Sequence, residues 1–262
     1  GALPRDYLET HSLEPTSGRF YAHLGDAEMD EGSMWEAVIE PVLNGIDRCT
    51  WVVDVNRQSL DRVVPGIRVR QFMDMLTANG WTVLTAKYGD RLTELMHRPG
   101  GEALRRRIDD MSNEEYQGLL VSDHGELKGR LLNGAGKGRS DLQRCVGDVD
   151  DDELYERITN LGGHDVGYLS RLLKKATDTP GSTAVFAYTV KGWGLHSAAD
   201  PRNHAATLTP KQFDQLAETT GRDPANPWER FSESSTEHKY IDDAIRRLGI
   251  RDTTVEPPLE FV

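Results

Sequence analysis

Residues 20–28 read Phe-Tyr-Ala-His-Leu-Gly-Asp-Ala-Glu, and this stretch decides the fold class. Its first five residues are typical of a β-strand, which the turn-forming pair Gly25 and Asp26 ends. Apolar residues then recur at helical spacing over residues 29–43, with Pro41 inside that stretch. We therefore predict a strand followed by a helix, and we expect Pro41 to kink that helix or end it early.

The same alternation of strand and helix continues along the chain. Residues 50–55 and 81–86 are short, apolar and rich in β-branched side chains, which is typical of buried strands. Between them, the spacing of Phe72, Met75 and Leu76 predicts a helix that ends near Asn79-Gly80, a good C-cap. Residues 182–190 predict one further strand. Alternating strands and helices predict an α/β fold, a parallel sheet with helices on both faces.

The remaining sequence predicts one domain with an insertion and an extension. Residues of about 90–178 are highly charged and mostly helical in pattern, so we expect a helical insertion there. Its glycine-rich segment 134–138 lacks the Gly-Lys-Ser/Thr ending of a phosphate loop and is interpreted as a surface loop. We predict a domain over 1–222 and a C-terminal extension or linker over 223–262.

Composition limits the classes of function. The chain has 262 residues, with 31 basic against 43 acidic residues and a formal charge of −12. This acidic balance argues against nucleic acid or an anionic membrane as a partner. Cys49 and Cys145 share no short spacing, which excludes a disulfide framework or a structural zinc site. The opening residues show no basic-then-apolar signal pattern, so we expect a cytoplasmic protein.

Polar residues follow the first two predicted strands. Asp26 comes directly after the first strand, and Asn56 and Gln58 follow the second. Asp26 and Asn56 are about 30 residues apart, which is the length of one strand–helix–strand unit. Both loops are therefore expected at the same edge of the sheet. Free N–H groups at a helix start suit a phosphate, and oxygen ligands beside it suit Mg²⁺. Two such loops can hold one Mg²⁺–diphosphate unit.

These residues resemble a known family. Residues 25–31, Gly-Asp-Ala-Glu-Met-Asp-Glu, followed by Asn56, resemble the thiamin diphosphate motif, in which Gly-Asp-Gly precedes an Asn by roughly 30 residues. The Glu-Met-Asp-Glu variant is similar to the homodimeric-type pyruvate dehydrogenase first component. Residues 162–165, Gly-Gly-His-Asp, and 189–194, Thr-Val-Lys-Gly-Trp-Gly, resemble later segments of that enzyme in the same order. The resemblance runs over about 20–213.

The resemblance implies the diphosphate-binding domain of the thiamin diphosphate-binding fold, with thiamin diphosphate and Mg²⁺ as cofactors. It implies that the side chains of Asp26 and Asn56 bind Mg²⁺ and that Gln58 adds its backbone carbonyl. Lys191 is expected near the diphosphate, and His204 is the nearest candidate for a catalytic, proton-handling group. The full set of implied cofactor-binding residues is Gly25, Asp26, Ala27, Glu28, Asp54, Asn56 and Lys191.

Three positions depart from the pyruvate enzyme. Ala27 replaces the third motif glycine, which places a methyl group beside the expected diphosphate. Asp54 stands where the pyruvate enzyme has Asn, and an acidic residue there is more similar to transketolase. Asn203-His204-Ala205 resembles a shorter loop found in transketolase-like relatives. These departures keep two reactions open: 2-oxo acid decarboxylation with acyl transfer, and ketol transfer of two carbons from a ketose phosphate, with a carrier-protein thiol as one acceptor.

The resemblance also implies a partner. In this family the cofactor binds between two domains, and the pyrimidine-binding half with its essential Glu does not follow within these 262 residues. We expect a pyrimidine-binding subunit to supply it, in an α2β2 heterotetramer, with a lipoyl or acyl-carrier protein as acceptor. The alternative is that the chain is a fragment. A different class, a non-catalytic binding or scaffold subunit, also stays open.

Each candidate residue also has a purely structural interpretation. Asp26 can cap a helix, and Asn56 can be a turn residue, but their paired spacing favours a metal site. Lys191 and His204 can be ordinary exposed loop residues. His164, in the Gly-Gly-His-Asp segment, is interpreted as a residue that orders a turn and not as a catalytic group.

Overall fold

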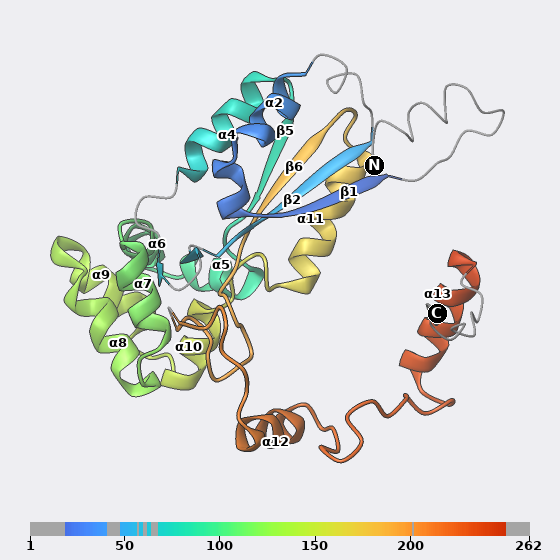
Figure 1. The fold of residues 1–262 in the computed structure, drawn as a ribbon. Helices are drawn as coiled ribbons and strands as arrows, with labels where there is room; N and C mark the ends of the chain where they lie inside the picture. The colour runs from blue at the N-terminus through green and yellow to red at the C-terminus, as the bar shows by residue number, and fades with distance from the viewer. Residues whose placement is uncertain are drawn as a thin grey trace. The chain divides into compact units, whose positions relative to one another are not determined.

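The computed structural model describes residues 19–40, 48–56, 58–59, 62–63, 68–200 and 202–249. The chain divides into two compact units, Gly1–Ala206 and Thr207–Val262. The first unit contains the sheet and the helices up to α11, and the second contains α12 and α13 (Figure 1).

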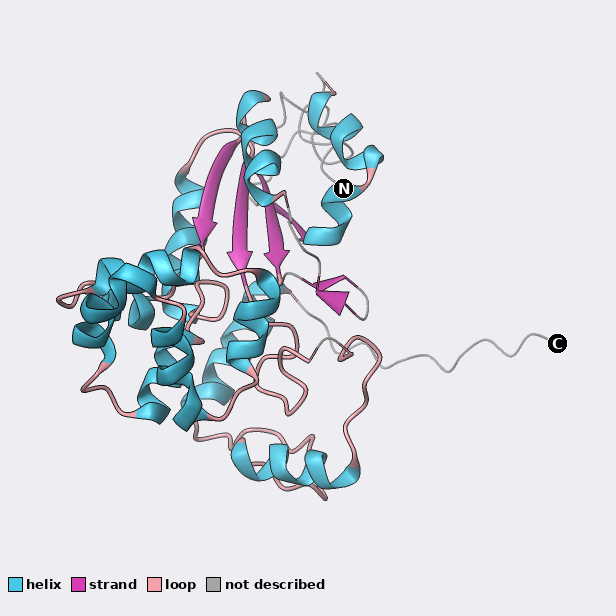
Figure 2. Ribbon diagram, turned by 90° about the vertical axis from the view of Figure 1, so that its left-hand side faces the viewer, coloured by secondary structure: helices cyan, strands magenta, loops and turns pink. Residues whose placement is uncertain are grey.

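A four-stranded parallel sheet forms the centre of the first unit, with the strands in the order β1-β2-β6-β5. The arrows in Figure 2 point the same way, so the carboxyl ends of the strands meet at one edge. A separate antiparallel pair, β3 (Gln58–Ser59) with β4 (Arg62–Val63), was not predicted. All four predicted strands are present: β1 (Phe20–Gly25), β2 (Cys49–Val55), β5 (Thr82–Ala86) and β6 (Thr183–Tyr188).

Helices cover both faces of this sheet (Figure 1). Neighbouring strand residues alternate between the faces, so Phe186 packs in the cluster that includes α2 (Gly32–Ile39) and α4 (Val69–Ala78). Val185 instead packs with α11 (Val166–Asp178). The predicted α/β fold, with a parallel sheet and helices on both of its faces, is confirmed.

The helix after β1 differs from its prediction. Residues Asp26–Asp30 form a 3₁₀ helix, η1, and α2 begins only at Gly32. The break lies at Glu31, whose backbone is extended and whose N–H donates to the carbonyl of Glu28 at 3.1 Å. This tight turn ends η1 before an α-helix can continue. The helix ends at Ile39, and the predicted effect of Pro41 falls outside the described residues.

Seven α-helices and one short 3₁₀ helix follow β5 over the stretch predicted to be helical. Apart from α11, they surround their own apolar core, which is rich in leucine. Side-chain caps start several of them, because Ser112, Asp123, Asp150 and Asp165 each accept a backbone N–H of the following helix. The elements before α11 are α5 (Asp90–Met96), α6 (Gly101–Asp109), α7 (Asn113–Leu120), α8 (His124–Asn133), η2 (Gly136–Gly138), α9 (Arg139–Val146) and α10 (Asp151–Ile158).

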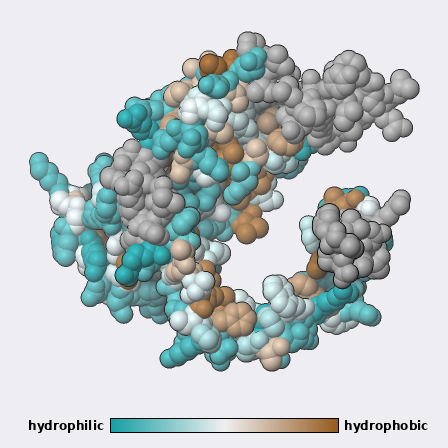
Figure 3. All heavy atoms as spheres, viewed as in Figure 1, coloured by the Kyte–Doolittle hydropathy of each residue, from teal (hydrophilic) through white to brown (hydrophobic). Residues whose placement is uncertain are grey.

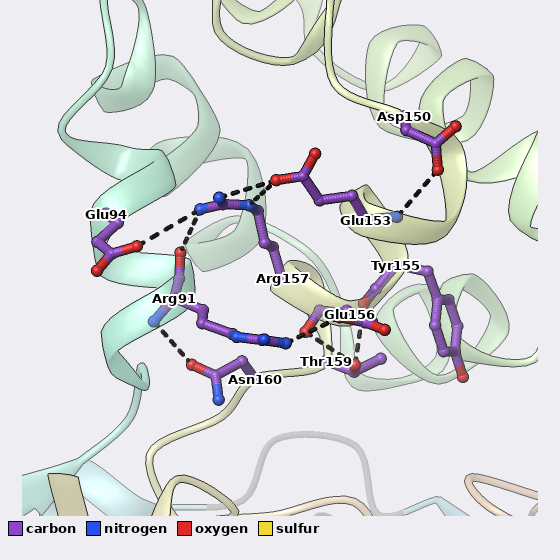
Figure 4. Close-up of polar contacts among 9 residues, drawn as sticks. All are labelled: Arg91, Glu94, Asp150, Glu153, Tyr155, Glu156, Arg157, Thr159 and Asn160. Atoms are coloured by element: carbon purple, nitrogen blue, oxygen red, sulfur yellow. Dashed lines mark hydrogen bonds and ion pairs between the residues drawn. The ribbon is translucent and has the colours of Figure 1, made fainter. Parts of the chain in front are cut away.

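Polar contacts attach the end of α10 to α5, the first helix after the sheet strand β5 (Figure 4). Arg157 donates from Nη1 to the Arg91 carbonyl at 3.3 Å and from Nε to Glu153 at 2.9 Å. Arg91 in turn donates its backbone N–H to Asn160 Oδ1 at 3.0 Å and pairs with Glu156 at 2.8 Å. This network fixes the point from which the chain turns back onto the sheet.

The Gly162-Gly163 turn lies directly on two strand ends. The Gly162 N–H donates to the carbonyl of Lys87 at 3.2 Å, and the Gly163 N–H donates to the carbonyl of Tyr188 at 3.0 Å. A Cβ on Gly162 would stand 2.5 Å from the carbonyl carbon of Ala86. The backbone therefore approaches so closely that only glycine fits.

The second unit contains two capped helices. In α12 (Pro210–Thr219), Pro210 occupies the first helical position, and Thr209 forms a capping box with Gln212. Helix α13 (Thr236–Leu248) ends at Gly249, which has the left-handed conformation usual for a C-cap. Thus local signals in the sequence define the start of α12 and the end of α13.

The surface agrees with the acidic, polar composition. Hydrophilic residues predominate on the face seen in Figure 3, and apolar residues are scattered among them. Within the described ranges, none of the helices combines the length and the apolar character needed to cross a membrane.

The close approach at Gly162 gives a prediction about stability. We expect Gly162→Ala to lower the free energy of unfolding by about 1–3 kcal/mol, the usual cost of overpacking, as measured by urea denaturation. Gly129→Ala is the matched control, because Gly129 lies inside α8 and nothing is within 4 Å of the position that a methyl group would take there. This control should be neutral or stabilising by up to about 1 kcal/mol. Equal stability of the two variants would contradict the close packing of the turn.

Candidate functional site

Three neighbouring strand ends bring the predicted site residues to one edge of the sheet. In the pairing of β1 with β2, Gly25 lies opposite Asp54, and in the pairing of β2 with β6, Val55 lies opposite Tyr188. Because these strands are parallel, the loops after β1, β2 and β6 leave the sheet side by side. The side-by-side placement of the first two loops agrees with the spacing between Asp26 and Asn56.

In the loop after β1, one carboxylate is buried and another acts as a cap. Asp26 is only 6% exposed, whereas Ala27 and Glu28 are exposed. The carboxylate of Glu28 accepts the Gly25 N–H at 2.7 Å. Among the described residues, nothing lies within 4 Å of the position that a Cβ would take on Gly25, so the backbone there borders open space within that part of the structure. A ligand can therefore approach the backbone at the end of β1.

In the loop after β2, Asp54 orients Asn56. The carboxylate of Asp54 accepts the Nδ2 amide of Asn56 at 3.1 Å and also the hydroxyl of Thr189. This bond holds the Nδ2 side of the Asn56 amide against Asp54. Gln58 begins β3, and only its backbone lies within the described structure. Thr189 is a site residue that the sequence analysis missed, although it begins one of the recognised segments.

The loop after β6 brings Lys191 and His204 together. Lys191 Nζ lies 3.1 Å from His204 Nδ1. An ammonium group only donates, so Nδ1 is the acceptor in this contact. This loop borders the loop after β2 and not the loop after β1, because β6 is the neighbour of β2. The structure thus pairs Lys191 with His204 in the loop that follows the strand next to β2.

Asn203 closes this loop, a role that was not predicted from the sequence. Its Nδ2 donates to the carbonyls of Lys191 and Ser197, both at 2.9 Å. The N–H of Ala199 donates to the same Lys191 carbonyl at 2.9 Å. The Oδ1 atom of Asn203 is buried and has no hydrogen-bond partner within the described structure. These bonds hold the backbone of Lys191 next to the segment that carries His204.

His164 fixes the start of the same loop. Its Nε2 accepts the Val190 N–H at 2.7 Å, and its ring stacks on Trp193 with centroids 4.6 Å apart. Burial lowers the pKa of His164, and the opposing charge of Asp54 only partly offsets this effect. His164 thus makes the turn-ordering contact that was expected, because a ring nitrogen accepts a backbone N–H here.

A second polar cluster lies at the end of β5 and was missed entirely. Lys87 and the hydroxyl of Tyr88 both donate to the carboxylate of Asp109. Burial raises the pKa of Asp109, but these bonds and the charges of Lys87 and Arg105 outweigh it and lower the pKa overall. Lys87 Nζ also lies 5.8 Å from the ring centre of Tyr188. The only signal in the sequence was the position of Lys87 directly after a strand.

The donor set suits a magnesium ion that is shared with phosphate. Among the described residues, no three His, Cys, Asp or Glu side chains gather as a self-sufficient metal site. The set offered by the strand ends is one buried carboxylate, Asp26, and the oriented amide of Asn56. Mg²⁺ in proteins is commonly held by one or two such oxygens together with substrate phosphates. The residues present therefore fit Mg²⁺ bound to a diphosphate.

Comparison with known proteins identifies relatives of the chain. It is 28% identical over 250 residues to the pyruvate dehydrogenase E1 component of Escherichia coli K12, covering 90% of this chain and 27% of that protein. It is 29% identical over 256 residues to the E1 component of Buchnera aphidicola from Acyrthosiphon pisum, covering 93% of this chain and 28% of that protein. No family model matches the chain.

A solved structure of a transketolase mutant from Pichia stipitis aligns with a TM-score of 0.46 at 15% identity, covering 94% of this chain and 27% of that one. The chain spans about a quarter of the length of the curated relatives. The sequence matches agree with the resemblance drawn from the motifs: the chain is similar in sequence to pyruvate dehydrogenase E1 components.

The lowered pKa of His164 gives a prediction about pH. The neutral ring stabilises the loop fully above the unfolded pKa of about 6.5, and this stabilisation is lost as the pH falls through the lowered folded value. We expect the wild type to lose more stability than His164→Gln between about pH 7 and about pH 5, as measured by urea denaturation. Gln keeps an acceptor but does not titrate. Parallel pH profiles would contradict the neutral role of His164.

Proposed function

We propose that this chain binds the Mg²⁺–diphosphate part of thiamin diphosphate and works in a thiamin diphosphate-dependent enzyme. The observation that carries the proposal is the side-by-side placement of the loops after β1 and β2, which bring Asp26 and Asn56 to one edge of the sheet. The relatives named as pyruvate dehydrogenase E1 components support the same class of enzyme.

In this proposal the ion takes protein ligands from both loops. Asp26 supplies a carboxylate oxygen, Asn56 its amide oxygen, and Gln58 its backbone carbonyl, and diphosphate oxygens complete the set. Asp54 would act through Asn56, because it holds the Nδ2 side of the amide whose oxygen would bind the ion. The open space at Gly25 admits the diphosphate, and Ala27 and Glu28 flank it through backbone groups.

Lys191 and His204 have different proposed roles: Lys191 balances the charge of the diphosphate, and His204 transfers a proton. The ammonium of Lys191 offsets the negative charge of the diphosphate, and its contact with His204 Nδ1 favours an imidazole that is protonated on Nε2. His204 can therefore donate a proton from Nε2, or take it back, during the reaction. The bound cofactor itself supplies an electron sink for carbon–carbon bond cleavage.

The proposed reaction is decarboxylation of a 2-oxo acid with acyl transfer, as the names of the relatives suggest. A pyrimidine-binding subunit supplies the family's Glu, in an α2β2 heterotetramer in the cytoplasm, and a lipoyl or acyl-carrier protein accepts the product. The second candidate is two-carbon ketol transfer from a ketose phosphate. Asp54 and the Asn203-His204-Ala205 segment favour that reaction, because they depart from the pyruvate enzyme.

Binding of the cofactor tests the proposed ligands. Asp26→Asn is expected to weaken Mg²⁺-dependent thiamin diphosphate binding at least about tenfold, because changes even in the residues behind metal ligands cost roughly 10–100-fold. Isothermal titration calorimetry, with and without the pyrimidine-binding partner, measures this effect. Asp30→Asn is the matched control, because Asp30 is an exposed carboxylate on the same 3₁₀ helix. Equal losses in both variants, or no binding to any mixture, would refute the site.

Product analysis separates the two reactions. We expect the chain with its partner to release CO₂ from pyruvate and to leave a ketose phosphate unchanged, as followed by isotope-labelled substrates and mass spectrometry. Cleavage of the ketose phosphate without decarboxylation of pyruvate would instead establish ketol transfer. Cofactor binding without turnover of either substrate would favour the non-catalytic scaffold subunit.

A further inference from the structure

A pocket in the helical stretch lies outside the site described above. Its volume is about 360 Å³, and it is lined by the end of α6, the turn after α8 and the start of α9. This volume is at the small end of the roughly 300–1,000 Å³ that is usual for ligand pockets. It is therefore large enough for a metabolite but not for a folded partner.

One wall of the pocket is a buried arginine. The side chain of Arg107 is only 7% exposed, and it lies against Gly134, where a Cβ would stand 1.9 Å from Nη2. Nε donates to the carbonyl of Leu131 at 3.1 Å, and Nη2 pairs with Glu115. A guanidinium carries five N–H donors, so these two acceptors use only part of its donor capacity, and Arg107 is one of the residues that line the pocket.

Two further cations and two carboxylates complete the lining. Arg106 and Lys137 are exposed and make no ion pair with any carboxylate in the described part of the chain. Asp141 is paired with Arg144 at 2.7 Å, which leaves Asp110 as the available carboxylate. The pocket therefore has excess positive charge in a chain whose formal charge is −12.

We propose that this pocket binds a small phosphorylated metabolite that carries hydroxyl groups. Arg106, Arg107 and Lys137 hold the phosphate, because guanidinium forks match its oxygens and form charge-assisted hydrogen bonds. Asp110 accepts hydrogen bonds from the hydroxyl groups. The segment 134–138, interpreted from sequence as a surface loop, contributes Lys137 and the glycine that admits Arg107. The phosphate is thus held by side chains and not by a phosphate loop.

Titration of the full chain with defined probes tests this site. The probes are glucose 6-phosphate, glucose, inorganic phosphate and sulfate, with binding followed by calorimetry. We expect saturable binding of glucose 6-phosphate that is tighter than binding of sulfate and absent for glucose. If glucose 6-phosphate binds no more tightly than sulfate, or does not saturate, the proposal fails.

Variants locate the binding. Arg106→Gln combined with Lys137→Gln should weaken glucose 6-phosphate binding at least about tenfold, the loss expected for removing two charge-assisted contacts. These side chains are exposed, so the double variant should fold, as its melting temperature can show. Arg130→Gln is the matched control, because Arg130 lies on α8, pairs with Glu126 and does not line the pocket. Equal binding by the double variant and the control would overturn the proposal.

Binding of glucose 6-phosphate in this pocket does not depend on the proposed cofactor site. Asp26→Asn should bind glucose 6-phosphate as the wild type does, because Asp26 lies at the end of β1 and not in the pocket. Loss of this binding in Asp26→Asn would mean that the sugar phosphate occupies the strand-end site, which would also overturn the proposal.

Discussion

The register between β1 and β2 is the constraint on which the rest of the site depends. Parallel pairing sets Gly25 opposite Asp54, so the chain leaves both strands at the same level. A shift of this register by one residue would turn every side chain of the strand to the other face. The buried residue Val53 on β2 opposes such a shift, because it belongs to the core that packs on α2 and α4. Core packing thus determines where the polar loops begin.

A series of polar contacts then connects the loop after β2 to the loop after β6. Asp54 joins Asn56 to Thr189, and the N–H of Thr189 donates to the carbonyl of Val55 at 3.1 Å. His164 lies in the turn that packs on β5 and β6, and it accepts the N–H of the next residue, Val190. Partly buried hydrogen bonds of this kind favour one arrangement, because leaving a buried member unpaired is costly. The position of Lys191 therefore follows from contacts that begin on β2.

Much of the fold could be predicted from local patterns. The strands were found because each is a short apolar run, and the parallel sheet followed from their alternation with helices. The placement of β6 between β2 and β5 could not be predicted, since strand order depends on contacts between residues far apart in the chain. The start of α2 was misplaced, because the extended backbone at Glu31 has no clear signal in the sequence.

In the candidate site too, local patterns predicted some features, and contacts between distant residues determined the others. Asp26 and Asn56 could be paired by their spacing, but the support that Asp54 gives Asn56 depends on side-chain geometry. The hydrogen bond from Asn203 to the carbonyl of Lys191 and the contact of Lys87 with Asp109 join segments that no local pattern in the sequence connects.

The central claim is that two neighbouring strand ends share one divalent ion. A crystal structure of the chain grown with Mn²⁺ and thiamin diphosphate tests it most directly, because Mn²⁺ replaces Mg²⁺ and is located by its anomalous scattering. The account predicts one ion within about 2.5 Å of oxygens from both Asp26 and Asn56 and of the diphosphate. An ion bound elsewhere, or Asp26 and Asn56 too far apart to contact a common ion, would contradict it.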